Sequence, residues 1–187
     1  MPKREIYTGL GEIIKYGIIY DARFFQYLED NIEQVASLAN EAAAHMTARS
    51  CEIKADVVSQ DEKELGLRAI LNFGHTAAHA IEKNTGYTKY NHGEAVAIGM
   101  VCAAYISKAL GMIDQSVVDR VISLILKLHL PIKAQGCTVE DLYRDIFHDK
   151  KTVGGKVKWI LMESIGQVCG NSNVPEEIVK GAMQKIV

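Results

Sequence analysis

Apolar side chains recur every three or four residues along most of this chain, and that period is typical of amphipathic helices. Near the start, Leu10, Ile14 and Ile18 fall on one stripe and predict a helix over residues 9–20. The same reading predicts further helices over residues 21–28, 32–60, 74–83, 93–110, 114–130 and 175–186, with another beginning at 138. Proline, a helix breaker, is absent between residues 3 and 130. The pattern therefore predicts a mainly α protein.

Several helix ends carry local signals of their own. Asp21 is expected to cap the helix that follows it, and Gly111 suits the left-handed residue that ends the helix over 93–110. Thr138 and Asp141 have the spacing of a variant capping box. Pro175 is expected at the first position of the last helix.

A single stretch alternates between apolar and polar residues as a β-strand does. It runs from Lys156 to Met162, follows two glycines, and precedes a second apolar stretch that ends at Val168. This arrangement predicts a small β-hairpin near residues 156–169. The chain shows no internal repeat, low-complexity tract or obvious linker, so we expect one domain over residues 1–187.

Composition and charge exclude several classes of protein. The chain has 21 Lys and Arg against 23 Asp and Glu, a net charge of −2, which predicts no general attraction to nucleic acid or to an anionic membrane. Its longest apolar run, Ala95 to Ile106, is shorter than the ~20 residues of a membrane-spanning helix. The N-terminus has no signal-peptide pattern, and the four cysteines form no C-x-x-C pair. We therefore expect a protein of the reducing cytoplasm, without a nucleic-acid or membrane partner.

Three of the six histidines lie close together in the sequence. His75 and His79 are four residues apart and share one face of a predicted helix, and His92 stands at the start of the next helix. Imidazole is a common ligand for divalent transition metals, so these residues are candidates for a metal site. Two histidines at this spacing also arise by chance on many helices, and the H-E-x-x-H motif of metalloproteases is absent.

Groups that bind anions gather in the same region of the sequence. Arg68, Asn72 and the backbone of Gly74 lie at a predicted helix N-terminus, which attracts phosphate or carboxylate. Glu12 and Lys15 lie one turn apart among apolar residues. Taken singly, such charges are usually solvated salt bridges. The apolar setting of Glu12 and Lys15 favours a functional role, because buried charge is costly unless it serves a site.

Taken together, five separated blocks of the chain resemble the C-terminal domain of 3-dehydroquinate synthases. The blocks are residues 9–17, 54–68, 68–82, 92–100 and 149–151, and they agree with the family in order and spacing. The resemblance covers nearly the whole chain and implies the multi-helical C-terminal fold of that family. It departs from the family at Ala78, where glycine is usual.

The resemblance also implies roles for individual residues. Glu12, His75 and His92 correspond to three ligands of a metal, Zn²⁺ or Co²⁺, whereas His79 corresponds to a residue that contacts substrate, which overrules its pairing with His75 on one metal. The other residues that match substrate-pocket positions are Lys15, Lys54, Glu64, Arg68, Asn72 and Lys150, with Lys151 as the alternative to Lys150.

The activity implied is the second step of the shikimate pathway, a carbon–oxygen lyase reaction. The family converts 3-deoxy-D-arabino-heptulosonate 7-phosphate to 3-dehydroquinate and phosphate by transient oxidation with NAD, phosphate elimination, reduction and an aldol cyclisation. This chain has no G-x-G-x-x-G motif and no alternation of strands and helices, so we expect the N-terminal NAD-binding α/β domain to be absent. We therefore expect a C-terminal domain that is inactive alone. Its implied partners are the sugar-phosphate substrate, the missing domain and a second copy in a homodimer.

Three other interpretations remain open at this stage. A related sugar-phosphate cyclase that makes 2-deoxy-scyllo-inosose or an epi-valiolone would share the metal and elimination residues. The metal-dependent alcohol and glycerol dehydrogenases are disfavoured by the dense set of anion-binding residues. A non-catalytic helical interaction module would bind no stoichiometric metal, and a chelator would not change its stability.

Overall fold

The computed structural model describes residues 3–61, 66–148, 152–153 and 156–187. Within them the helices are α1 (Lys3–Ile19), α2 (Ala22–Asp30), α3 (Ile32–Ser37), α4 (Asn40–Gln60), the 3₁₀ helix η1 (Leu67–Asn72), α5 (His75–Asn84), α6 (His92–Ala109), α7 (Gln115–Lys127), α8 (Val139–His148) and α9 (Glu176–Met183). The strands are β1 (Thr152–Val153), β2 (Lys156–Val157), β3 (Trp159–Ser164) and β4 (Gln167–Asn171). The prediction of a mainly α fold is confirmed. The predicted site residues Glu64 and Lys150, and the alternative Lys151, lie outside the described residues.

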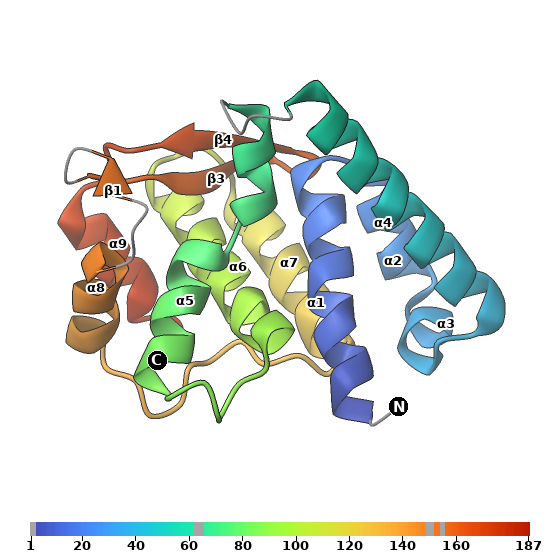
Figure 1. The fold of residues 1–187 in the computed structure, drawn as a ribbon, viewed down its shortest axis with the longest axis horizontal. Helices are drawn as coiled ribbons and strands as arrows, with labels where there is room; N and C mark the ends of the chain where they lie inside the picture. Colours follow the sequence, from blue (N-terminus) through green and yellow to red (C-terminus); the bar gives the residue numbers. More distant parts are fainter. Residues whose placement is uncertain (1–2, 62–65, 149–151, 154–155) are drawn as a thin grey trace.

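Helix α6 lies at the centre of the molecule, in contact with α1, α5, α7, α9 and β3. The apolar run from Ala95 to Ile106 is buried in this helix, apart from partly exposed Tyr105. A helix that is apolar on every side must be covered on every side, which explains why the other helices surround it. Figure 1 shows β3 and β4 lying across one end of these helices and α4 flanking α1. No helix of the described ranges is both long and apolar enough to cross a membrane.

Two glycines allow α6 to approach its neighbours closely. A Cβ atom on Gly93 would overlap the carbonyl oxygen of Thr8 in α1. A Cβ atom on Gly99 would overlap the carbonyl oxygen of Gly74, the residue that precedes α5. Any larger residue would push the backbones apart. These contacts hold α6 close to α1, which carries Glu12, and to the start of α5, which carries His75.

The predicted hairpin is formed by β3 and β4. The strands pair antiparallel, with Leu161 opposite Cys169, and Gly166 in the connecting turn has a φ of +90° that favours glycine. The Ser107 hydroxyl of α6 accepts a hydrogen bond of 2.9 Å from the Met162 backbone N–H, which fixes the hairpin to the central helix. The predicted strand over 156–162 differs in one respect, because β2 pairs with β1 in a second small sheet.

The single helix predicted over residues 32–60 is wrong, because the structure contains two helices there. Leu38 adopts a left-handed conformation with φ 54°, and its N–H and that of Ala39 bond the last carbonyls of α3. Neither proline nor glycine marks this break. The Leu38 side chain is partly buried against the core, a contact that favours this otherwise strained conformation of a leucine. Tertiary packing has overridden the continuous helical pattern.

The signals at other helix ends have mixed outcomes. The Asp21 side chain accepts hydrogen bonds from the first N–H groups of α2, and Gly111 is left-handed after α6, as predicted. The Thr138 hydroxyl accepts a hydrogen bond of 3.1 Å from the Asp141 N–H at the start of α8. The helix predicted to reach residue 130 ends at Lys127, because His129 is left-handed with φ 58°. The last helix begins after Pro175 and ends at Met183, somewhat shorter than predicted.

Candidate functional site

Helix α1 contributes Glu12 and Lys15 to the candidate site. Lys15 is only 3% exposed, and its Nζ atom lies 2.6 Å from Glu12 Oε2. Burial lowers the pKa of Lys15, the charge of Glu12 opposes this effect, and the like charge of Lys54 on α4 adds to it. Lys54 belongs to α4, which is in contact with α1. A buried ammonium group held beside a carboxylate is suited to meeting a further anion.

The chain between α4 and α5 brings His75 to the same place. The short helix η1 packs against α1, α4 and the hairpin, and Gly74 follows it with φ 78°, a conformation that favours glycine. His75 is then the first residue of α5. Its Nδ1–H donates to the Phe73 carbonyl at 3.1 Å, which leaves Nε2 free of a proton in the neutral ring.

Glu12, His75 and His92 come together from three helices. One ligand atom from each residue lies within 4.8 Å of the others. Glu12 Oε1 is 3.9 Å from His75 Nε2 and 3.9 Å from His92 Nε2. Within the described ranges, Glu12 Oε1 is one of two buried side-chain oxygen or nitrogen atoms without a hydrogen-bond partner. An unpartnered buried carboxylate oxygen that faces two imidazole nitrogens indicates a place for a cation.

The protonation of the histidines agrees with this interpretation. Burial and the charge of Lys15 lower the pKa of His75 from 6.5 to about 4, so the ring is neutral near pH 7. His92 Nδ1 lies 2.9 Å from Glu82 Oε1, and since a carboxylate only accepts, Nδ1 carries the proton. In the neutral form of each ring, the Nε2 lone pair then faces Glu12. Metal-bound histidines show this arrangement, with the second nitrogen donating to a carbonyl or carboxylate.

The distances are close to those of a metal site. Zn²⁺ takes nitrogen and carboxylate oxygen ligands at about 2.0–2.2 Å in tetrahedral geometry, so two ligands of one ion lie about 3.3–3.6 Å apart. The two 3.9 Å separations at Glu12 Oε1 are a few tenths of an ångström wider, so small side-chain movements would bring these atoms onto one ion. Two neutral imidazoles and one carboxylate form a donor set of the type found at catalytic zinc sites, which keep one position open for water or substrate.

His79 lies beside this cluster, but its ring nitrogens are not among the donor atoms that come together there. Its ring centroid is 5.8 Å from that of His75 and 6.5 Å from that of His92. It occupies the same face of α5, one turn after His75, as its spacing predicts. The structure thus brings together the three residues that the family resemblance singles out and places His79 at their edge.

The remaining described candidates lie on neighbouring elements. Arg68 and Asn72 belong to η1, and the N–H of Arg68 donates to Asp61 Oδ2 at 2.9 Å. Asp61 also accepts from the N–H of Gly66 at 2.8 Å, so its carboxylate fixes the start of η1. Lys54 lies on an exposed face of α4, and α4 and η1 are in contact. The elements that carry these cationic and amide groups are thus neighbours, and η1 also contacts α1, the helix of Glu12.

Glu82 lies in the same region, and no role for it was predicted from the sequence. It is 8% exposed and hydrogen-bonded to His92. It lies seven residues after His75 on α5 and hence on the same helix face. The sequence offered one signal for such a role, an acidic residue seven positions after His75 among alanines and an isoleucine. Its partner His92 lies ten residues further along the chain, after a turn, so only the fold shows that the two side chains meet.

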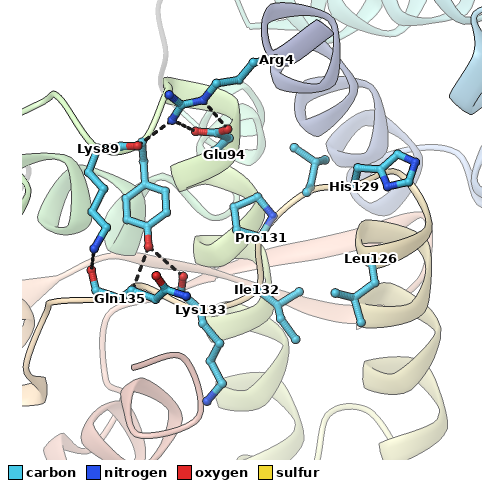
Figure 2. A pocket seen from close by; sticks show the side chains of 11 residues that line it. Arg4, Lys89, Glu94, Leu126, His129, Pro131, Ile132, Lys133 and Gln135 are labelled. Atoms are coloured by element: carbon cyan, nitrogen blue, oxygen red, sulfur yellow. Dashed lines mark hydrogen bonds and ion pairs between the residues drawn. The ribbon is translucent and has the colours of Figure 1, made fainter.

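Figure 2 shows a cavity of about 620 Å³ near the N-terminal end of α1. Arg4 forms an ion pair of 2.6 Å with Glu94 and donates to the Lys89 carbonyl at 2.6 Å. Lys89 Nζ in turn donates to the Gln135 carbonyl at 2.6 Å. In the part of the chain that the structure describes, its lining includes none of the predicted site residues. Arg4 and Glu94 pair with each other, and Lys89 and Lys133 donate to backbone carbonyls, so the Glu12–His75–His92 cluster is the stronger candidate site.

The sequence of this chain is similar to those of named proteins. The 3-dehydroquinate synthase C-terminal family matches residues 9–152. A 3-dehydroquinate synthase of a Shewanella species is 46% identical over 96% of this chain and 50% of its own length. A 3-dehydroquinate synthase of a Synechocystis species is 47% identical over 98% of this chain and 52% of its own length. The chain thus spans about half the length of the curated relatives it matches.

Solved structures of lower identity share the fold. The 2-epi-5-epi-valiolone synthase of Streptomyces hygroscopicus, solved with NAD⁺ and Zn²⁺, has a TM-score of 0.88 at 24% identity and is matched over 98% of this chain and 51% of its own. A 2-deoxy-scyllo-inosose synthase, solved with carbaglucose-6-phosphate, NAD⁺ and Co²⁺, has a TM-score of 0.83 at 22% identity, over 100% of this chain and 54% of its own. With the family match covering most of the sequence, this chain belongs to the 3-dehydroquinate synthase C-terminal family.

Proposed function

We propose that this chain is the metal- and substrate-binding half of a 3-dehydroquinate synthase. In this proposal Glu12, His75 and His92 hold a divalent metal, Zn²⁺ or Co²⁺, and the surrounding charged residues bind 3-deoxy-D-arabino-heptulosonate 7-phosphate. An N-terminal domain that binds NAD completes the enzyme. The observation that carries the proposal is the unpartnered buried Oε1 of Glu12, 3.9 Å from the Nε2 atoms of both histidines. The naming of both curated relatives as 3-dehydroquinate synthases supports the choice of reaction.

The residues around the cluster suit the charge of this substrate. A bound divalent metal would lower the pKa of a substrate hydroxyl and polarise the ketone formed from it. Lys15, buried beside Glu12, would donate to a substrate oxygen at the site. Arg68, Asn72 and His79 would bind the phosphate, and Lys54 would add positive charge. Positioning and neutralisation of a substrate with both carboxylate and phosphate are then the main contributions of this half.

The metal content of the purified chain tests the ligand assignment. We expect one equivalent of zinc or cobalt after loading and gel filtration, measured by mass spectrometry of the elements. Glu12→Ala and His92→Ala should lose most of it, because each removes one of three ligands. His45→Ala is the matched control, since this exposed histidine of α4 lies outside the cluster and should leave the metal content unchanged. Equal, stoichiometric metal content in all four proteins would contradict the ligand assignment, whereas no metal in any of them would favour a non-catalytic helical module.

Ligand binding and turnover test the substrate. The heptulosonate phosphate should raise the melting temperature of the metal-loaded chain, because a ligand that binds only the folded state stabilises it. Stabilisation by glucose 6-phosphate instead would favour a 2-deoxy-scyllo-inosose synthase. With NAD and the heptulosonate phosphate we expect no phosphate release above background from this chain alone. Appreciable release would refute the need for a separate NAD domain.

A further inference from the structure

The two histidines of the cluster are held in place in different ways. The His75 side chain is 13% exposed, and its Nδ1–H donates to a backbone carbonyl, so packing and main chain both fix its ring. The His92 side chain is 49% exposed and opens α6 after a turn, so packing restrains it far less. The donor nitrogen of His92 nevertheless lies at the same 3.9 Å from Glu12 Oε1 as that of His75. Something other than burial must orient the His92 ring.

Glu82 is the group in position to do so. Its Oε1 atom accepts the Nδ1–H of His92 at 2.9 Å. The residue is 8% exposed, and α5 otherwise buries Ala77, Ala78, Ala80 and Ile81. Burying a carboxylate in such surroundings is costly unless it is well paired, and a methionine or leucine would pack there without that cost. The carboxylate is therefore not explained by packing.

We propose that Glu82 is a positioning residue that holds His92 in its Nδ1–H form, with Nε2 facing Glu12 and His75. The inference rests on the metal site proposed above and adds to it a residue outside the ligand set. A neutral imidazole has one N–H, and a free side chain favours that proton on Nε2. Accepting Nδ1–H selects the other tautomer, aims the Nε2 lone pair, and strengthens the ring as a ligand.

The variants Glu82→Met and Glu82→Gln distinguish the effects of side-chain shape, of the hydrogen bond to His92 and of the negative charge. Methionine fills the space but cannot accept the N–H, whereas glutamine keeps an accepting oxygen without the charge. The tautomer of His92 is read in the metal-free chain by two-bond ¹H–¹⁵N correlation NMR. Zn²⁺ affinity is read by chelator competition, and the geometry of the site by the visible absorption of the Co²⁺ form.

We expect the Nδ1–H form in the wild type and in E82Q, and the Nε2–H form in E82M. We expect Zn²⁺ affinity to fall about 10–100-fold in E82M, as is typical when the partner of a metal-bound histidine is removed, and less in E82Q. The Co²⁺ spectrum should change in E82M. An Nε2–H form in the wild type, or an E82M protein with unchanged tautomer and affinity, would overturn the proposal. Equal affinity losses in E82M and E82Q would assign the effect to charge and also overturn it.

Asp145→Asn provides the matched control. Asp145 on α8 is likewise 8% exposed, and it accepts from Lys83 and Asn84 of α5 at 2.7 and 2.6 Å. Its loss should lower the melting temperature while leaving the His92 tautomer and the Zn²⁺ affinity unchanged. A shift of the tautomer in D145N would show that any damage to α5 suffices, and would sink the specific role of Glu82. A wild type that binds no metal would remove the proposed function, while the tautomer comparison would still decide the role of Glu82.

Discussion

Lys15 shows what a single residue of this sequence reveals. A lysine among apolar neighbours on a predicted helix suggested a buried charge with a function, and the structure buries it to 3% exposure beside Glu12. Burial alone was thus predictable from the pattern. The direction in which its ammonium group points, toward the Glu12–His75–His92 cluster, depends on how α1 packs against α5 and α6.

Lys15→Met tests whether this burial serves binding rather than stability. Methionine has a similar shape but leaves Glu12 without its partner; because the Glu12 side chain is 32% exposed, the free energy of unfolding should fall by no more than about 1–3 kcal/mol. Affinity for the heptulosonate phosphate should fall by about tenfold or more, since a hydrogen bond to a charged group is worth about 1.5–3 kcal/mol. Urea unfolding and calorimetric titration of the metal-loaded chain measure the two effects. A variant that is strongly destabilised, or that binds substrate as well as the wild type, would contradict this role.

At the scale of elements, the site depends on the close approach of α6 to α1 and α5. The hydrophobic period located α6 within one or two residues, because a fully apolar segment of that length has few alternatives to a buried helix. The pattern did not predict which helices would contact it, nor that residues 32–60 form two helices. The break at Leu38 has no local signal, since it is stabilised by contacts of its side chain with the core.

Gly99→Ala tests this close approach. The added Cβ would overlap the Gly74 carbonyl oxygen at the start of α5, so we expect a loss of stability of about 1–3 kcal/mol, together with weaker metal binding as His75 moves away from His92. Gly9→Ala is the control, because Gly9 lies on exposed α1 surface with nothing within 4 Å of an added Cβ. That variant should gain up to about 1 kcal/mol from helix propensity. Thermal unfolding and chelator competition on both variants provide the comparison, and equal behaviour of the two would argue against the packing role.

At the scale of the whole molecule, the cluster ties together residues 12, 75 and 92 on three helices. An unfolded chain does not hold these residues near one another, so the metal should bind the folded state almost exclusively. Metal binding then reports whether α1, α5 and α6 are packed together as in the folded protein. A helical module in which the histidines are incidental would show no such link between metal binding and folding.

Metal addition should accordingly stabilise the chain. At a free Zn²⁺ concentration 100 times its dissociation constant, the expected gain is about 2.7 kcal/mol, or roughly 5–11 °C in melting temperature for a domain of this size. A chelator should reverse the gain, and Glu12→Ala should abolish it. Differential scanning calorimetry with and without metal measures the shift. An identical melting temperature in both conditions would exclude a metal site that depends on the fold.

The sequence by itself determined most of the helices, the small hairpin and the residue types available for chemistry, because periodicity, caps and turns reflect interactions between residues a few positions apart. The blocks that resemble 3-dehydroquinate synthases also singled out Glu12, His75 and His92. Only the tertiary structure decided that their donor atoms converge, that Glu82 meets His92, and that Leu38 breaks a helix. Each of these depends on contacts between separate elements, and such contacts form when backbones approach and side chains pack, which no local pattern encodes.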